Sequence, residues 1–426
     1  MKLFPHQVDG LKQTGNHPHC ALYWDMGLGK TFGGSEKMMQ YGNRTNLVIC
    51  QKSKINDWVH HFKEHYEYKV FDLTKPKQFS EYCELVQGNR FNNVGVINYE
   101  LAWRRKDLLV LKDFTLMLDE SSLIQNKTAK QTKFILRLNP KNVILLSGTP
   151  TAGKYENLWT QAHLLGWNIS EDLYNNQYVN WKTIESDGFY HKIVDKDNPY
   201  KNVERLKQKF RDYGAVFMKT AEVFNLPEQT FTTVTVPTSK EYKKFMRDSI
   251  VQLPDGTELI GDQIFTKRLY ARQLCGMYSA NKLEAFKELI QSTNDRVIVF
   301  YNFNGELELI KAVCEAENRP YSQINGAVKD LSAYEENVDS VTICQYQSAS
   351  MGHNLQKANK MIYFSLPERS DLFEQSKARI HRIGQNRPCF YWFLQCENSV
   401  EESIYQALQE RKDFTDELFQ EMGKKI

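Results

Sequence analysis

The stretch DMGLGKT spans residues 25–31 and directly follows the apolar residues LYW. Small residues in such a turn let backbone N–H groups approach a phosphate, and the lysine side chain reaches the terminal phosphates. The threonine hydroxyl can ligate Mg²⁺. A glycine-rich turn with a surface lysine is the alternative, because Trp24 stands where the usual loop begins with glycine. We predict a nucleotide-binding loop made of Asp25, Met26, Gly27, Leu28, Gly29, Lys30 and Thr31.

Short apolar runs separated by helix-period segments recur along the chain. This alternation is typical of parallel strands joined by crossover helices, so the fold class is α/β. We expect strands at 46–50, 94–97, 116–118, 143–146, 297–300, 341–344, 361–364 and 390–394. A polar and aromatic middle stretch lies between the two groups of runs, and Pro227 marks the expected hinge. We therefore expect two lobes, 1–224 and 225–426, each with a mostly parallel sheet flanked by helices.

An acidic pair ends one of these runs, where the sequence reads TLMLDESS. Open parallel sheets place ligands and metals at the carboxyl ends of their strands. Asp119 would hold Mg²⁺ through water, and Glu120 would orient and polarise the attacking water. A solvated turn is the alternative for such a pair taken alone. With the glycine-rich loop upstream, we predict catalytic roles for Lys30, Asp119 and Glu120 and metal-binding roles for Thr31 and Asp119.

The composition limits the other classes of function. Of 426 residues, 41% are hydrophobic, and a net charge of +3 indicates no large positive field, so any nucleic-acid groove must be local. The eight cysteines form no CxxC pair, which argues against a zinc site or a disulfide framework and favours a reducing compartment. The N-terminus lacks an apolar signal core, and no apolar run approaches the roughly 18 residues of a spanning helix. We expect a soluble protein.

Further segments occur in the order of the motifs of one large family. LFPHQVDGL begins at residue 3, KSKINDW at 52, INYEL at 97 and SGTPTAGKYENLW at 147. In the second half VIVFYNF begins at 297, ASMGHNLQKANKMIYF at 349 and EQSKARIHRIGQ at 374. Together with the loop and the acidic pair, these segments resemble helicase superfamily two over nearly the whole chain, and most closely its Swi/Snf-like members. The segment at 374 is similar nearly residue for residue.

The resemblance implies a role for residues in each segment. It places Gln7 at the adenine, and Gly352 and Asn354 at the nucleotide. Arg379 and Arg382 become arginine fingers, a role that suits planar guanidinium groups facing a transferring phosphoryl group. The family commonly has histidine two residues after the acidic glutamate, whereas Ser122 stands there in this chain, which leaves open how that coupling contact is made. Contacts with the nucleic-acid backbone are implied for Lys52, Ser53, Tyr99, Thr149 and Tyr301.

The same resemblance implies two tandem RecA-like lobes that close on ATP and Mg²⁺ while both grip DNA, duplex or branched, with RNA less favoured. We therefore expect a monomeric ATP-dependent DNA translocase or helicase with no membrane partner. The expected setting is replication, recombination or repair in the cytoplasm of a bacterium or a phage-infected host. An ATP-switched DNA-binding or scaffold protein without net movement is the alternative.

Overall fold

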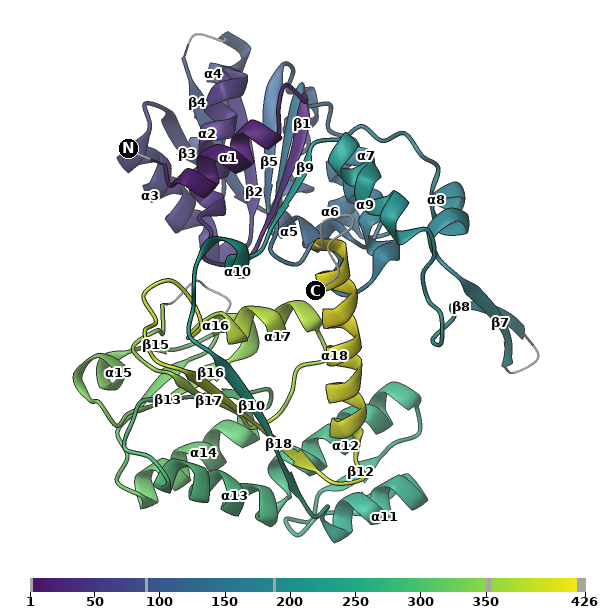
Figure 1. The fold of residues 1–426 in the computed structure, drawn as a ribbon, viewed down its shortest axis with the longest axis vertical. Helices are drawn as coiled ribbons and strands as arrows, with labels where there is room; N and C mark the ends of the chain where they lie inside the picture. The colour runs from purple at the N-terminus through teal and green to yellow at the C-terminus, as the bar shows by residue number, and fades with distance from the viewer. Residues whose placement is uncertain (1–2, 89–90, 187–188, 350–353, 420–426) are drawn as a thin grey trace. The chain divides into compact units, whose positions relative to one another are not determined.

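Two seven-stranded sheets organise the chain, one in each of two units (Figure 1). The computed structural model describes residues 3–88, 91–186, 189–349 and 354–419. The first unit contains the chain up to Val223 together with the chain from Asp413 onward, and the second unit runs from Phe224 to Lys412. The predicted α/β class with two mostly parallel sheets is confirmed. Among the described residues, no helix combines the length and the apolar character needed to cross a bilayer.

The sheet of the first unit is entirely parallel and contains all four strands predicted for this half of the chain. Strands β2, β4 and β6 are buried along their whole length, as expected where helices cover both faces of a parallel sheet. The order across the sheet is β3 (Lys69–Asp72), β4 (Asn93–Asn98), β2 (Thr45–Cys50), β5 (Phe114–Asp119), β6 (Asn142–Leu146), β1 (His19–Trp24) and β9 (Ala215–Met218).

Most helices of the first unit connect these strands, because parallel neighbours need a crossover, whereas α1 (Pro5–Gln13) precedes the first strand and α10 (Thr220–Val223) follows the last. The others are α2 (Lys30–Tyr41), α3 (Ile55–His65), α4 (Pro76–Gly88), α5 (Tyr99–Ala102), α6 (Lys130–Ile135), α7 (Trp159–Leu164), α8 (Glu171–Tyr178) and α9 (Val203–Asp212). Short 3₁₀ turns are η1 (Lys52–Lys54), η2 (Lys106–Val110), η3 (Ser121–Ile124) and η4 (Tyr155–Leu158). An antiparallel hairpin, β7 (Trp181–Ser186) and β8 (Phe189–Val194), is inserted between α8 and α9.

The sheet of the second unit is parallel apart from one antiparallel edge strand. Along its central strand β13, Val297, Val299 and Tyr301 belong to one buried apolar cluster, whereas Ile298 and Phe300 belong to another. Successive side chains of a strand point to opposite faces, so both faces of this sheet are covered. The order is β10 (Gln229–Val236), β18 (Cys389–Cys396), β17 (Lys360–Tyr363), β13 (Val297–Tyr301), β16 (Val341–Gln345), β14 (Tyr321–Ile324) and β15 (Lys329–Asp330).

All four runs predicted for the second half are strands of this sheet. A separate small hairpin pairs β11 (Ile250–Gln252) with β12 (Glu258–Ile260). The helices are α11 (Lys240–Asp248), α12 (Ile264–Met277), α13 (Ala280–Gln291), α14 (Asn304–Ala316), α15 (Ser332–Glu336), α16 (Tyr346–Ala349), α17 (Ser370–Lys377) and α18 (Val400–Phe419).

Candidate active site

Three loops meet at the carboxyl edge of the first sheet. Strands β1, β6 and β5 are neighbours, and their register pairs Leu22 with Leu146 and Leu146 with Asp119. Because these strands are parallel, the chain leaves all three of them at the same edge. The glycine-rich loop follows β1, the acidic pair lies at the end of β5, and residues 147–149 follow β6. The strand order therefore assembles segments that are far apart in the sequence.

The glycine-rich loop has the backbone of an anion-binding turn. Gly27 and Gly29 have φ angles of 88° and 75°, in the left-handed region that side chains rarely adopt, and α2 begins directly afterwards at Lys30. The exposed N–H groups at the start of a helix attract anions. The Lys30 ammonium donates to the carbonyl oxygens of Trp24 at 2.8 Å and Asp25 at 3.2 Å, so this side chain lies along the loop. The loop has the shape and the charge that phosphate groups require.

Trp24 stands where the usual loop begins with glycine, and two neighbouring helices make room for it. Its side chain is fully buried at the end of β1. A Cβ atom added to Gly10 of α1 would lie 2.5 Å from Cζ2 of the indole, and one added to Gly33 of α2 would lie 2.7 Å from Cζ3. Both distances are well inside van der Waals contact. The departure from the usual loop is therefore accommodated by glycine in the two helices that pack on the indole.

Gln7 is buried on α1 and is bonded to the same loop. Its Nε2 donates to the carbonyl oxygens of Leu28 and Gly29, both at 3.3 Å, and its Oε1 accepts from Phe4 N at 3.0 Å. These bonds hold α1 against the loop. The expected contact between this amide and adenine stays a prediction, and it would require some of these bonds to be exchanged for bonds to the base.

The beginning of the loop is fixed by residues from the far end of the first unit. Asp25 Oδ2 accepts from Thr220 N at 3.0 Å, and the Thr220 hydroxyl donates to Met26 O at 3.3 Å. Asp25 N also donates to Met218 O at 2.9 Å. Asp25 and Met26 therefore secure the loop to β9 and α10 and define its shape. No sequence signal pointed to Thr220, which lies 195 residues from Asp25.

Asp119 is held in place from two sides. The Trp58 indole N–H donates to its Oδ2 at 2.8 Å, and the Tyr99 hydroxyl donates to its backbone oxygen at 2.8 Å. Burial raises the pKa of Asp119, while the Trp58 hydrogen bond and the charges of Lys30 and Lys54 act in the opposite direction. The positive charge of Lys30 therefore favours the ionised form of this carboxyl group. Trp58 is the last residue of the segment KSKINDW, for which the sequence suggested no contact with the acidic pair.

Glu120 is the other half of the acidic pair and has an unusual backbone. Its φ of 53° and ψ of 60° lie in the left-handed region, which a side-chain-bearing residue seldom occupies. Strain of this kind accumulates at functional sites, where the surroundings impose it.

Thr31 and Gly148 lie beside the lysine of the phosphate loop. Thr31 is half-buried in the first turn of α2, and a Cβ added to Gly148 would lie 3.4 Å from Lys30 Nζ. The loop after β6 thus packs against the lysine of the phosphate loop.

The residues expected to touch nucleic acid fall into two groups. Lys52 is exposed and Ser53 is half-buried in η1, directly after β2, so both remain candidates for backbone contacts. Tyr99, Thr149 and Tyr301 are only 1%, 4% and 0% exposed. Their side chains are therefore enclosed by the protein, and the expected contacts of these three residues with nucleic acid stay a prediction. Tyr99 supports the end of β5, and Tyr301 lies in the core beside its sheet.

In the second unit, the two expected arginine fingers lie in a turn. Helix α17 ends at Lys377, so Arg379 and Arg382 do not share a helix face as a continuous helix would require. Burial lowers the pKa of Arg382, although a guanidinium this basic stays charged. The carbonyl oxygen of Arg379 accepts from Leu355 N at 3.2 Å. The arginine turn is therefore bonded to the segment that resembles the preceding helicase motif.

Gln385 strengthens that connection. Its Nε2 donates to the carbonyl oxygens of Gln356 at 3.1 Å and Ala358 at 2.8 Å. The end of the segment at 374–385 thus has a structural role, because Gln385 joins it to residues 356–358. Asn354, one of the predicted nucleotide ligands, directly precedes Leu355 in the sequence, and its side chain is exposed. Gly352, the other, lies outside the described residues.

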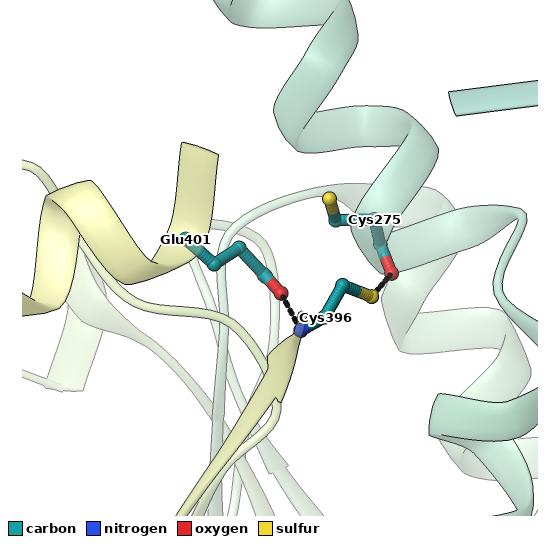
Figure 2. A group of neighbouring side chains, drawn as sticks. All are labelled: Cys275, Cys396 and Glu401. Atoms are coloured by element: carbon teal, nitrogen blue, oxygen red, sulfur yellow. Dashed lines mark hydrogen bonds between the residues drawn. The ribbon is translucent and has the colours of Figure 1, made fainter. Parts of the chain in front are cut away.

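A second cluster of ionisable groups lies in the second unit. Cys275, Cys396 and Glu401 place sulfur and oxygen atoms within 4.8 Å of one another, and all three residues are buried (Figure 2). Glu401 already accepts from Cys396 N at 3.0 Å and from the Lys282 ammonium at 2.5 Å. A second cation there would meet the positive charge of Lys282. Two of the dispersed cysteines therefore come together, but the cluster is best described as a buried ion pair with neighbouring thiols.

A parallel sheet with a phosphate loop after one strand and an acidic pair after a near neighbour defines the P-loop class of nucleotide-binding proteins. Comparison with known families identifies the branch. The chain belongs to the SNF2-related domain family, whose profile matches residues 11–280, and residues 281–384 match the Helicase conserved C-terminal domain. The Swi/Snf-like resemblance expected from the motifs is confirmed.

Individual relatives are distant and longer. The chain is similar to the ISWI chromatin-remodeling complex ATPase ISW1 of Saccharomyces cerevisiae, with 23% identity over 95% of this chain and 39% of that protein. It is 24% identical to the putative ATP-dependent helicase/translocase YwqA of Bacillus subtilis, over 72% of this chain and 36% of that protein. The Sulfolobus solfataricus SWI2/SNF2 ATPase core in complex with dsDNA is 20% identical, with a TM-score of 0.45 over 98% of this chain and 92% of that chain. The chain thus spans less than half the length of these two curated relatives.

Proposed function

We propose that this chain hydrolyses ATP and uses the cycle to move along DNA. The observation that carries the proposal is the meeting of a phosphate loop, its lysine and two carboxylates at one edge of a parallel sheet, in a chain of the SNF2-related family. We assign nucleotide binding to the lobe at residues 1–224 and the arginine fingers to the lobe at 225–426. The division of the two units after Val223 supports this boundary, whereas the chain from Asp413 onward groups with the first unit and not with the second.

The first lobe would bind the nucleotide through its backbone and its lysine. N–H groups of the loop face the phosphates, and Lys30 exchanges its two carbonyl partners for the terminal phosphates. Thr31 and Asp119 offer a hydroxyl and a carboxylate oxygen, the hard donors that suit Mg²⁺, and both lie at the carboxyl edge of the sheet. Bound Mg²⁺ would neutralise charge on the phosphate oxygens. Trp58 fixes the orientation of the Asp119 carboxylate.

Hydrolysis would then need a positioned water and positive charge from the other lobe. We assign the orientation of the water to Glu120, whose strained backbone turns the chain at the end of β5. Arg379 and Arg382 supply guanidinium groups to the γ-phosphate when the lobes close. The hydrogen bonds that join the arginine turn to residues 355–358 would transmit that closure within the second lobe.

We propose DNA as the track, contacted through its backbone by Lys52 and Ser53 beside the active edge of the sheet. The relatives are named as an ATPase of a chromatin-remodelling complex and as ATP-dependent helicases, which supports an ATP-driven task on DNA. Backbone contacts carry no sequence information and weaken as salt rises, because they release counterions. The proposed motor should therefore bind many sequences and lose affinity at high salt.

The test is steady-state ATP hydrolysis by the full chain without nucleic acid, with duplex DNA, with single-stranded DNA and with RNA. We expect many turnovers and strong stimulation by DNA. Displacement of a third strand from a DNA triplex, dependent on ATP, would report movement. Equal rates with and without DNA would contradict the proposal, and a single turnover without strand displacement would favour an ATP-controlled binding protein instead.

A further inference from the structure

One buried amide is hydrogen-bonded to residues that flank all three loops of the candidate active site. Gln161 lies on α7 and is 0% exposed. Its Oε1 accepts from the Tyr23 hydroxyl at 2.9 Å and from the Ser121 hydroxyl at 2.8 Å, and its Nε2 donates to Pro150 O at 2.8 Å. Tyr23 lies on β1 just before the phosphate loop, Ser121 directly follows the acidic pair, and Pro150 directly follows residues 147–149. A single side chain therefore contacts each of the three segments.

Two neighbouring side chains of the same helical segment also form hydrogen bonds to the acidic segment, and one of them bonds the loop after β6 as well. Asn157 Nδ2 donates to Gln125 Oε1 at 2.7 Å and to Thr151 O at 3.0 Å. The Thr160 hydroxyl donates to Ile124 O at 2.9 Å. Residues 124 and 125 continue the acidic segment, and residue 151 continues the loop after β6. Together η4 and α7 hold these two loops in one arrangement, and among the partners of their side chains in the acidic segment, Ser121, the partner of Gln161, lies closest to the acidic pair in sequence.

The chemistry of Gln161 points to more than packing. An apolar side chain of similar size would fill the same volume, but it would leave two buried hydroxyls and a carbonyl oxygen without this partner. The amide supplies an acceptor for the two hydroxyls and a donor for the carbonyl, so its bonding pattern matches the three segments. Ser122, where the family commonly has histidine, is itself buried at 4% exposure. In this chain Gln161, and not the residue at position 122, makes the contact between the acidic segment and the loop after β6.

We infer that Gln161 is the positioning residue that couples the loop after β6 to the acidic pair. The inference rests on the proposed function. A shift of residues 147–151 during the motor cycle would pull on Pro150, and Gln161 would pass that shift to Ser121 and so to Glu120 next to it. Nucleotide binding depends on the phosphate loop, which Gln161 contacts only through Tyr23 on the preceding strand. Loss of the amide should therefore lower kcat while leaving the affinity for nucleotide nearly unchanged.

The experiment compares kcat and nucleotide Kd of the full chain, with and without duplex DNA, for Gln161→Leu, Tyr23→Phe and Tyr82→Phe. We expect Gln161→Leu to lower DNA-stimulated kcat by about tenfold or more, with nucleotide Kd within roughly threefold of wild type. Tyr23→Phe should lower kcat less. Tyr82→Phe is the matched control, because it also removes a buried tyrosine hydroxyl from the first lobe, one that donates to Asn46 O at 3.0 Å, far from this network. It should leave kcat unchanged.

A fourth variant, Gln161→Glu, tests the role of Gln161 through the pH dependence of kcat, which a residue that only packs in the core would not change. A protonated carboxyl can still donate to Pro150 O and accept from both hydroxyls, whereas a carboxylate faces the carbonyl oxygen with no proton. Burial raises the pKa of such a carboxyl. We therefore expect this variant to approach wild-type kcat at low pH and to lose activity as pH rises through that pKa, at temperatures where it stays folded throughout.

The possible outcomes separate this inference from the proposed function. A folded Gln161→Leu chain with wild-type kcat, or a pH profile of Gln161→Glu identical to that of wild type, would overturn the role of Gln161. If Gln161→Leu does not fold, Tyr23→Phe and Gln161→Glu decide. If the wild-type chain hydrolyses ATP without any response to DNA, the translocase proposal fails, and Gln161 is then judged on kcat without DNA.

Discussion

Replacing a helical glycine by alanine usually stabilises a protein, but at Gly33 we expect the change to lower the free energy of unfolding. Alanine is favoured over glycine inside a helix by about 1 kcal/mol, and Gly33 lies in the first half of α2. In this structure, however, the new Cβ would lie 2.7 Å and 2.8 Å from two carbons of the Trp24 ring and 3.2 Å from Leu22. The ring cannot retreat, because Gly10 closes on its other side. Overpacking of this kind costs about 1–3 kcal/mol.

We therefore expect Gly33→Ala to destabilise the chain by up to about 2 kcal/mol after the gain in helix propensity. For a unit of this size the midpoint of thermal unfolding should fall by up to roughly 8 °C. Gln40→Ala, at an exposed position of the same helix, is the control for propensity alone. Trp24→Phe removes the ring atoms that clash, so Gly33→Ala should cost less in that background. An increase in stability on Gly33→Ala in wild type would refute this account of the loop.

Other predictions follow from single contacts. Lys30→Ala should remain folded and lose ATP hydrolysis, and Glu120→Gln should bind nucleotide without turnover; ATPase activity near wild type in either folded variant would remove that residue from the mechanism. Burial lowers the pKa of His61 to about 4, so the unfolded chain takes up a proton below about pH 6.5 before the folded chain does. Stability should therefore fall between pH 6.5 and pH 4, and His61→Gln should flatten that dependence in urea titrations. Lys282→Met leaves the Glu401 carboxylate buried without its ammonium and should cost about 3–5 kcal/mol, most of it recovered by adding Glu401→Leu; an equally unstable double variant would show that packing, not charge, is responsible.

The eight central strands were predictable because a strand buried on both faces leaves an uninterrupted apolar run. Several of the strands that the pattern missed are short or lie at sheet edges. Strand β9 has four residues, and β10, at the edge of its sheet, alternates threonine with apolar residues in QTFTTVTV. Strand β1 is fully apolar only from Cys20 onward and directly precedes the phosphate loop. In the sheet β1 lies between β6 and β9, and the local sequence pattern does not predict which strands become neighbours.

The same limit applies to the candidate site. Motif spacing predicted which loops form it, because each loop follows a strand. It did not predict which side chains pair across the loops, since Trp58 and Asp119 are 61 residues apart and meet only because β2 and β5 are neighbours. The position of a residue in a motif also predicts where its backbone lies, but it does not predict where its side chain points. Tyr99 follows its strand as expected, yet its side chain turns inward to the end of β5.

We propose that Arg379 and Arg382 stabilise the transition state of ATP hydrolysis. The most direct test measures DNA-stimulated kcat and nucleotide Kd for Arg379→Ala, Arg382→Ala and Arg382→Lys. Arginine fingers contribute about 10³–10⁵ in rate, so we predict a large loss of kcat with nucleotide Kd nearly unchanged. Lysine should rescue poorly, because a point charge does not reproduce the planar guanidinium. Retained kcat in both alanine variants would contradict the two-lobe mechanism.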